Sequence, residues 1–242
     1  MSRSNPQEDT AKNPATKFLR WDSDKNVWRY WDKEAEERRE LPMNTPFIFL
    51  DSLFAATGFN QPKNCGIWSN EVRNVKHQLV VQDKDGEVFS GTWQEVKAKL
   101  DYAKFCTSVY AMAKVGDGYE LVNFQLSGCA LGPWIDFVKE QGGQKELEGD
   151  IVLTVKEYEH KKIGRVEFNA PVFGVATRKL TDEARAQAEE MDKTLQQYLA
   201  VYLEHSPQAK AVKEHSKSME AYEAPVPNNA PIEKDEEDDF PF

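Results

Sequence analysis

Long apolar runs and cysteines are both scarce in this 242-residue chain. No apolar stretch approaches the roughly 18 residues that would predict a membrane-spanning helix, so we expect a soluble protein. The N-terminal residues lack the apolar core of a secretion signal. Cys65, Cys106 and Cys129 are too few and too widely spaced for a disulfide framework, so we expect reduced thiols in a cytosol.

Familiar catalytic and metal-binding motifs are also missing. The sequence has no phosphate loop of the form GxxxxGK, no HExxH and no pairing of Cys and His with the spacing of a zinc site. Ser127 lies near two glycines but does not match GxSxG. We therefore predict no catalytic residue, no metal site and no cofactor. A metal-dependent nuclease stays as an alternative, which incubation of labelled DNA with Mg²⁺ or Mn²⁺ would reveal.

Positive charge is in short supply as well, because the formal net charge is −10. This excludes a strongly basic surface, but the negative charge is unevenly distributed. From Pro225 onward there are six acidic residues against the single Lys234, so this end alone carries −5 and the remainder of the chain the other −5. Local basic patches are therefore compatible with the sequence.

Polar and turn-forming residues divide the chain into segments. Residues 1–16 have no apolar period and predict a disordered leader. Residues 17–31 read as a hairpin across a polar turn, and the charged stretch 33–40 reads as a connector. Further strands are predicted in residues 45–59, around the Asp85–Gly86 turn, on both sides of VGDG at 115–118 and in residues 150–173.

Three segments have a helical period. They are residues 93–100, the stretch ALGPWIDFVKEQGG at 130–143, and residues 181–205, which follow the N-cap candidate Thr181. The last of these could pack on the strands or mediate self-association. Residues 221–242 are rich in Pro and Asn and then acidic, which predicts an unstructured tail.

Hairpin-linked strands with one helix before the last strand pair predict a mainly β protein. A five-stranded Greek-key barrel of the oligonucleotide/oligosaccharide-binding (OB) type fits this order. We expect the barrel and its N-terminal hairpin extension in residues 17–180, a C-terminal helical segment in residues 181–220 and the tail after it.

Four short sequence segments then indicate a family. In their order and spacing, they resemble the core of bacteriophage single-stranded DNA-binding proteins. The segments are IWSNEVRN, SGTWQEVK, FCTSVYAM and LVNFQLSGCALGPWIDF. The resemblance covers roughly residues 45–175. It implies an OB barrel that binds single strands without sequence preference, in phage DNA replication, recombination and repair in the cytoplasm of an infected bacterium. The alternatives are a metal-dependent nuclease of a phage replication module and a protein-only adaptor.

Single-strand binding needs aromatic rings for the bases and cations for the backbone. Residues 17–31 interleave both, and residues 59–77 form a second ring-bearing basic loop. In a strand, Trp28 and Tyr30 point to one face while Arg29 and Trp31 point to the other, so both faces cannot bind DNA. The predicted DNA-binding residues are Arg20, Trp21, Trp28, Arg29, Tyr30, Trp31, Phe59, Lys63, Trp68, Arg73, Lys76 and Lys104. Tyr102, Tyr110 and Lys114 are weaker candidates.

The chain ends in five acidic residues and the sequence Phe-Pro-Phe. This resembles the acidic, Phe-terminated tails with which bacterial and phage single-stranded DNA-binding proteins recruit replication and repair enzymes. Rings beside carboxylates form a compact ligand for a pocket with a basic rim. We predict that Asp238, Asp239, Phe240, Pro241 and Phe242 bind a polymerase, helicase, primase or nuclease. No membrane partner is expected, and a monomer or a dimer would both fit.

Overall fold

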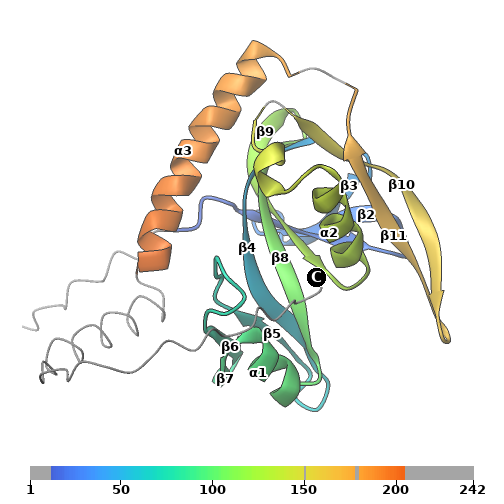
Figure 1. The fold of residues 1–242 in the computed structure, drawn as a ribbon, viewed down its shortest axis with the longest axis vertical. Coiled ribbons are helices and arrows are strands. Elements are labelled where there is room, and N and C mark those ends of the chain that lie inside the picture. The colour runs from blue at the N-terminus through green and yellow to red at the C-terminus, as the bar shows by residue number, and fades with distance from the viewer. Residues whose placement is uncertain (1–11, 150, 178–179, 205–242) are drawn as a thin grey trace, which may run out of the picture.

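Strands dominate the computed structural model, which describes residues 12–149, 151–177 and 180–204 (Figure 1). The strands are β1 (Lys17–Asp22), β2 (Val27–Asp32), β3 (Glu37–Pro42), β4 (Phe47–Asn60), β5 (Cys65–Ser69), β6 (Leu79–Asp83), β7 (Gly86–Gly91), β8 (Ala103–Val115), β9 (Gly118–Ser127), β10 (Val152–Ile163) and β11 (Val166–Val175). The α-helices of these residues are α1 (Trp93–Lys99), α2 (Leu131–Glu140) and α3 (Asp182–Glu204). The predicted β-rich class is confirmed.

The long strand β4 organises one mixed sheet. Its partners are β8, β10 and the short strand β5, all antiparallel. Strand β8 continues into β9, and β9 pairs in parallel with β1, the first strand of the meander β1–β2–β3. Strands β10 and β11 form a hairpin beyond β4. The sheet is therefore larger than the expected five-stranded barrel.

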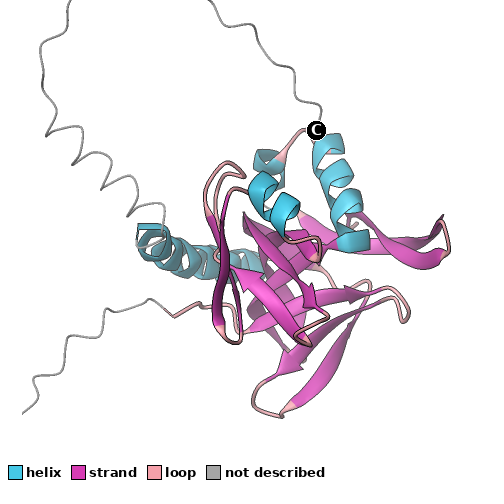
Figure 2. Ribbon diagram, turned by 90° about the horizontal axis from the view of Figure 1, so that it is seen from below, coloured by secondary structure: helices cyan, strands magenta, loops and turns pink. Residues whose placement is uncertain are grey.

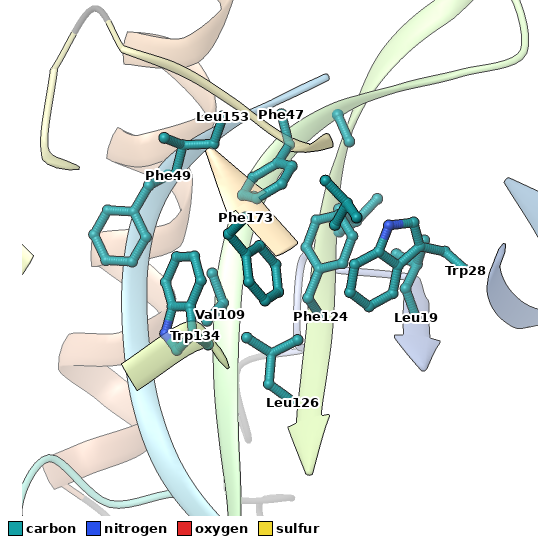
Figure 3. Packing of buried hydrophobic residues seen from close by; sticks show 14 of the residues in the cluster. Leu19, Trp28, Phe47, Phe49, Val109, Phe124, Leu126, Trp134, Leu153 and Phe173 are labelled. Carbon is teal, nitrogen blue, oxygen red and sulfur yellow. The ribbon is translucent and has the colours of Figure 1, made fainter. Parts of the chain in front are cut away.

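The main hydrophobic core lies on the inner face of this curved sheet (Figure 3), where Trp134 and Phe137 of α2 pack with it. Trp28 contacts Phe124 edge to face with ring centroids 4.8 Å apart, and Trp134 meets Phe173 at 5.2 Å. Each such buried side chain contributes about 1.5–3 kcal/mol of transfer free energy. Trp134 of α2 is buried in this core.

A smaller core lies where β4 and β5 meet β6, β7 and α1. Val96 of α1 packs there with Ile67, Leu79 and Val81. The helix starts with a capping box in which Thr92 and Glu95 bond one another's backbone, as its sequence TWQEVK favours. This unit stands at the end of the molecule away from the β8–β9 turn (Figure 1).

Helix α3 packs on the outer face of the sheet. The Thr181 hydroxyl accepts a hydrogen bond from the Ala184 N–H at 3.2 Å, so the predicted N-cap is confirmed. Ala184 and Ala188 pack near Ile48 and Met112, while Leu195 and Leu199 pack against Leu53, Tyr110 and Leu121. The helix therefore uses its apolar stripe within the chain.

Most predicted elements are found close to their expected positions, and three expectations are wrong. The stretch 59–77, expected as a loop, contains β5, and Ala15 of the leader expected to be disordered is buried against α3. The hairpin of residues 17–31, the Asp85–Gly86 hairpin, the three helices and the strand pair after α2 are confirmed. The charged stretch 33–40 is no simple connector, because residues from Glu37 form β3 along the edge of β2. Its charged side chains of both signs suit an edge strand, because they protect it from pairing with other chains. The N-terminal extension is accordingly a three-stranded meander rather than a hairpin.

Candidate nucleic-acid interface

Strand β2 divides its aromatic residues between the two faces of the sheet. Trp28 is 0% exposed and Tyr30 is buried beside it in the main core. Trp31 points to the other face and is 53% exposed. Trp28 and Tyr30 therefore offer no ring to a base, and their prediction as DNA-binding residues is wrong because their face of β2 packs on β9 and β11.

Trp21 belongs to the core side as well. Its ring is half-buried against Trp28, with centroids 5.2 Å apart. Its Nε1–H donates a hydrogen bond to the Asn169 carbonyl of β11 at 2.8 Å. Trp21 thus ties the N-terminal meander to β11, and its accessible part lines the same groove as Arg20, Arg29 and Trp31.

The outer face of the meander carries a cluster of cations. Arg20 and Arg29 stand directly opposite one another in the β1–β2 register, and Trp31 stands opposite Arg38 in the β2–β3 register. Arg38, which the sequence analysis missed, has no carboxylate partner among the described residues and lines a groove of about 570 Å³ with Arg20, Arg29 and Trp31. The charged residues 37–40 show no apolar period by which a strand, and with it the position of Arg38, could have been predicted.

Two of these arginines are held in position by neighbours. Arg20 donates from Nε to Oε1 of Gln125 on β9 at 2.7 Å, which leaves the outer edge of its guanidinium unoccupied among the described contacts. Arg29 forms an ion pair with Asp22. Burial works against the charge of Asp22, but the hydrogen bonds from Arg29 and from two backbone N–H groups outweigh it and lower the pKa of this carboxyl.

A second cluster with exposed aromatic rings lies near the C-terminal end of β4. Trp68 of β5 pairs with Thr57 and is 50% exposed, while Phe59 lies two residues further along β4 on the same face and is exposed too. Thr57 in turn pairs with Lys104 of β8, so Lys104 lies on the same face next to the rings. These three predicted residues are brought together.

The sheet register places the two clusters on the same side of the sheet, but Leu53 and Ser108 between them are buried, Leu53 under α3. Gln125, which accepts the hydrogen bond from Arg20, pairs with Ser108 of β8. Ser108 in turn pairs with Leu53 of β4. One step along the same face come Ser127, Cys106 and Ala55, whose side chains are small. The clusters are four strand spacings apart between β2 and β4, which is about 19 Å across the sheet. We call the face that carries Arg20, Arg29, Trp31, Arg38, Phe59, Trp68 and Lys104 the outer ring-and-cation face.

Other predicted cations are engaged elsewhere. Lys63 bonds the buried Asp83 at 2.8 Å, and this hydrogen bond raises the pKa of Lys63. Arg73 makes a two-pronged contact with Asp51, which raises the pKa of Arg73, and it lies beside α3. Lys76 is exposed in the loop between β5 and β6. The structure does not bring these three residues into the outer ring-and-cation face.

The weaker candidate Tyr110 serves a buried polar network under α3. Its hydroxyl donates to Oε2 of Glu71 at 2.6 Å, and Asn123 donates to the same carboxyl at 3.4 Å. The backbone N–H of Glu71 donates to the Tyr202 hydroxyl of α3 at 2.8 Å. Burial raises the pKa of Glu71 despite these hydrogen bonds. Tyr110 is fully buried, so it presents no ring to a ligand.

The described residues contain no group of three or more side chains placed to hold a metal ion. In the part of the chain that is described, no helix is long and apolar enough to cross a membrane. The predicted partner-binding residues Asp238, Asp239, Phe240, Pro241 and Phe242 lie outside the described residues. Comparison with protein-family models, curated proteins and solved structures finds no match.

Proposed function

We propose that this chain is a sequence-independent single-stranded DNA-binding protein. The observation that carries the proposal is that exposed rings and cations share one face: Trp31, Phe59 and Trp68 stand with Arg20, Arg29, Arg38 and Lys104. Rings accept bases of any identity, and cations accept the backbone. Because each stacked base contributes about 1–3 kcal/mol, three rings can outweigh weak repulsion from a negative molecule at moderate salt.

The strand pairings support an OB barrel as the finer fold. In such a barrel the first strand pairs with the second and the fourth, and a helix precedes the fourth strand. Strand β4 pairs with β8 and β10, β8 with β9, and β10 with β11, with α2 before β10. The closing pair would join β9 to β11. In the described residues β9 pairs instead with β1, and Trp21 bridges from β1 to β11.

The biological role that fits is coating of single strands during phage DNA replication, recombination and repair in the cytoplasm of the bacterial host. The acidic tail would then recruit a polymerase, helicase, primase or nuclease. Removal of residues 233–242 should abolish capture of such enzymes from an infected-cell lysate and leave binding to single strands intact. Loss of capture with no DNA binding by the whole chain would support the adaptor alternative.

The decisive experiment compares labelled oligo-dT with duplex DNA of equal length in an anisotropy titration. We expect tight binding of oligo-dT, and a variant with Trp31→Ala, Phe59→Ala and Trp68→Ala should bind it at least about 100-fold more weakly, since three stacks are lost. Circular dichroism shows whether the variant is folded. If the folded variant binds oligo-dT as the unchanged protein does, the proposal is wrong. Cleavage of the oligonucleotide with Mg²⁺ would favour the nuclease.

A further inference from the structure

The hairpin of β10 and β11 projects from the body as an arm. Side chains from Lys156 to Glu167 are exposed on both of its faces. At its tip Ile163 pairs with Val166, and these side chains are 70% and 64% exposed. An isolated two-stranded hairpin is marginally stable in water, and exposed apolar side chains that cluster mark an interaction site more often than scattered ones. The tip is therefore a candidate site for contact with a partner.

The charges around the tip indicate the chemistry of that partner. Arg165 lies in the turn and has no carboxylate partner among the described residues. Lys161 bonds Glu159 at 3.1 Å and Lys162 bonds Glu167 at 2.5 Å, but such exposed pairs are weak and exchange readily. The tip is thus apolar, and the charges around it have a small positive excess, with Lys161, Lys162 and Arg165 against Glu159 and Glu167.

A groove with the opposite character lies between β4 and α3. It has a volume of about 470 Å³, and Leu50, Leu180 and Ala188 supply its apolar part. Glu148, Glu189 and Asp192 stand along it without an ion-pair partner among the described contacts. Its two arginines, Arg73 and Arg185, stand against the four acidic residues Asp51, Glu148, Glu189 and Asp192, so the groove is negative on balance. This acidic groove complements the arm in both polarity and charge.

We propose that the arm tip of one copy of this chain docks in the acidic groove of the next copy. The arm and α3 lie on opposite sides of the molecule in both ribbon views, so one chain cannot satisfy its own groove (Figures 1 and 2). Contacts between two different surfaces repeat from copy to copy and build an open row or a ring, whereas a two-fold dimer would pair identical surfaces.

This contact gives the proposed DNA-binding function a means of cooperation, and it rests on that function. A hairpin tip buries little area, so the contact is weak between free molecules. A DNA strand that holds two copies side by side raises their effective concentration to the millimolar range. We therefore expect a monomer in dilute solution and cooperative occupation of long single strands.

Cross-linking without DNA tests the contact itself. A variant with Ile163→Cys at the tip is mixed at high concentration with a variant with Glu189→Cys in the groove, and a short thiol-specific cross-linker is added. We expect heterodimers well above the background that the unchanged chain gives through its own cysteines. Glu34→Cys, in the exposed turn between β2 and β3, replaces Glu189→Cys as the matched control. Cross-linking no stronger than in the control, or homodimers of the tip variant alone, would overturn the proposal.

DNA binding separates this inference from the proposed function. A variant with Ile163→Ser and Val166→Ser should bind an oligo-dT that holds one copy as the unchanged chain does. On a strand that holds several copies it should need about ten-fold more protein for half-saturation, with loss of sigmoidal binding. If the unchanged chain fails to bind the short oligonucleotide, the proposed function fails and the cross-linking result still decides the contact. Equal cooperativity in variant and unchanged chain contradicts the contact.

Discussion

At Trp68 the indole ring stands half-exposed beside Phe59, with Lys104 one strand further on. Replacement by alanine removes a stacking surface without opening the core. We expect Trp68→Ala to weaken oligo-dT binding by about 1–3 kcal/mol, or roughly 5- to 150-fold, at constant salt. Anisotropy titration measures this change. Tyr119→Ala is the matched control, since its exposed ring lies at the β8–β9 turn away from both clusters. An equal loss in both variants would argue against stacking at Trp68.

Trp28 and Trp31 are three residues apart and should respond to mutation in opposite ways. Trp28→Ala empties a fully buried site, so the free energy of unfolding should fall by about 3–5 kcal/mol. Trp31→Ala removes an exposed ring and should change it by less than about 0.5 kcal/mol, while it weakens DNA binding. Urea unfolding followed by circular dichroism measures both values. Equal stability losses would contradict the assignment of faces.

The sequence indicated several residues of the outer ring-and-cation face but could not tell which aromatic rings are exposed and which are buried. An alternation of aromatic and basic residues in VWRYW predicts a strand with rings on both faces, and either face could have been the core. The choice depends on β9 and β11, which are about a hundred residues or more away along the chain and pack on the Trp28 face. Long-range packing of this kind leaves no local signal. Arg38 was missed for a related reason, because β3 is defined only by its pairing with β2.

Helix α3 is docked over a buried carboxyl, and this makes its stability depend on pH. Burial raises the pKa of Glu71 above its ordinary value of 4.5, so the folded chain holds the proton more firmly than the unfolded chain does. The stabilisation is therefore fully present below the ordinary pKa and is lost as the pH rises through the raised one. Above that range the folded chain carries a charge among Tyr110, Asn123 and the tyrosines of α3.

Glu71→Gln should remove this pH dependence. Glutamine can still accept from Tyr110, and its amide can donate to the Asn123 Oδ1 atom, which has no partner among the described contacts. We expect the variant to gain stability relative to the unchanged chain as the pH is raised from about 4.5, in urea unfolding at a series of pH values. Glu190→Gln, on the exposed side of α3, is the control. If the three stability curves run parallel, the buried carboxyl does not govern the docking of α3.

The elements themselves were more predictable than their pairing. Asp-Gly and Gly-Asp-Gly turns defined two hairpins, and the capping residues and apolar stripes defined three helices, because these signals are local. The parallel pairing of β1 with β9 joins residues more than a hundred positions apart and has no signal of that kind. The side of the sheet that α3 covers was equally undetermined, since its apolar stripe would also suit a dimer.

The net charge of the whole molecule is −10, so any affinity for DNA must come from a few local contacts. Arg20, Arg29, Arg38 and Lys104 are the four cations of the outer ring-and-cation face. With about −0.7 per phosphate neutralised on a single strand, the logarithm of the binding constant should fall against that of the salt concentration with a slope of about −3. Anisotropy titrations at several NaCl concentrations give this slope, and affinity that is independent of salt would contradict a backbone contact.

Replacement of Arg38 or of its neighbour Arg39 distinguishes a direct contact with DNA from an effect of the net charge of the molecule. Arg38 faces Trp31 across the strands, whereas Arg39 lies opposite Tyr30 and pairs with Asp32 and Glu37. Either change to glutamine alters the net charge equally, and at 0.15 M salt charges more than about 8 Å away are largely screened. Arg38→Gln should therefore reduce the slope by about 0.7, while Arg39→Gln leaves it unchanged. Equal reductions would mean that the DNA responds to the field of the whole molecule rather than to this face.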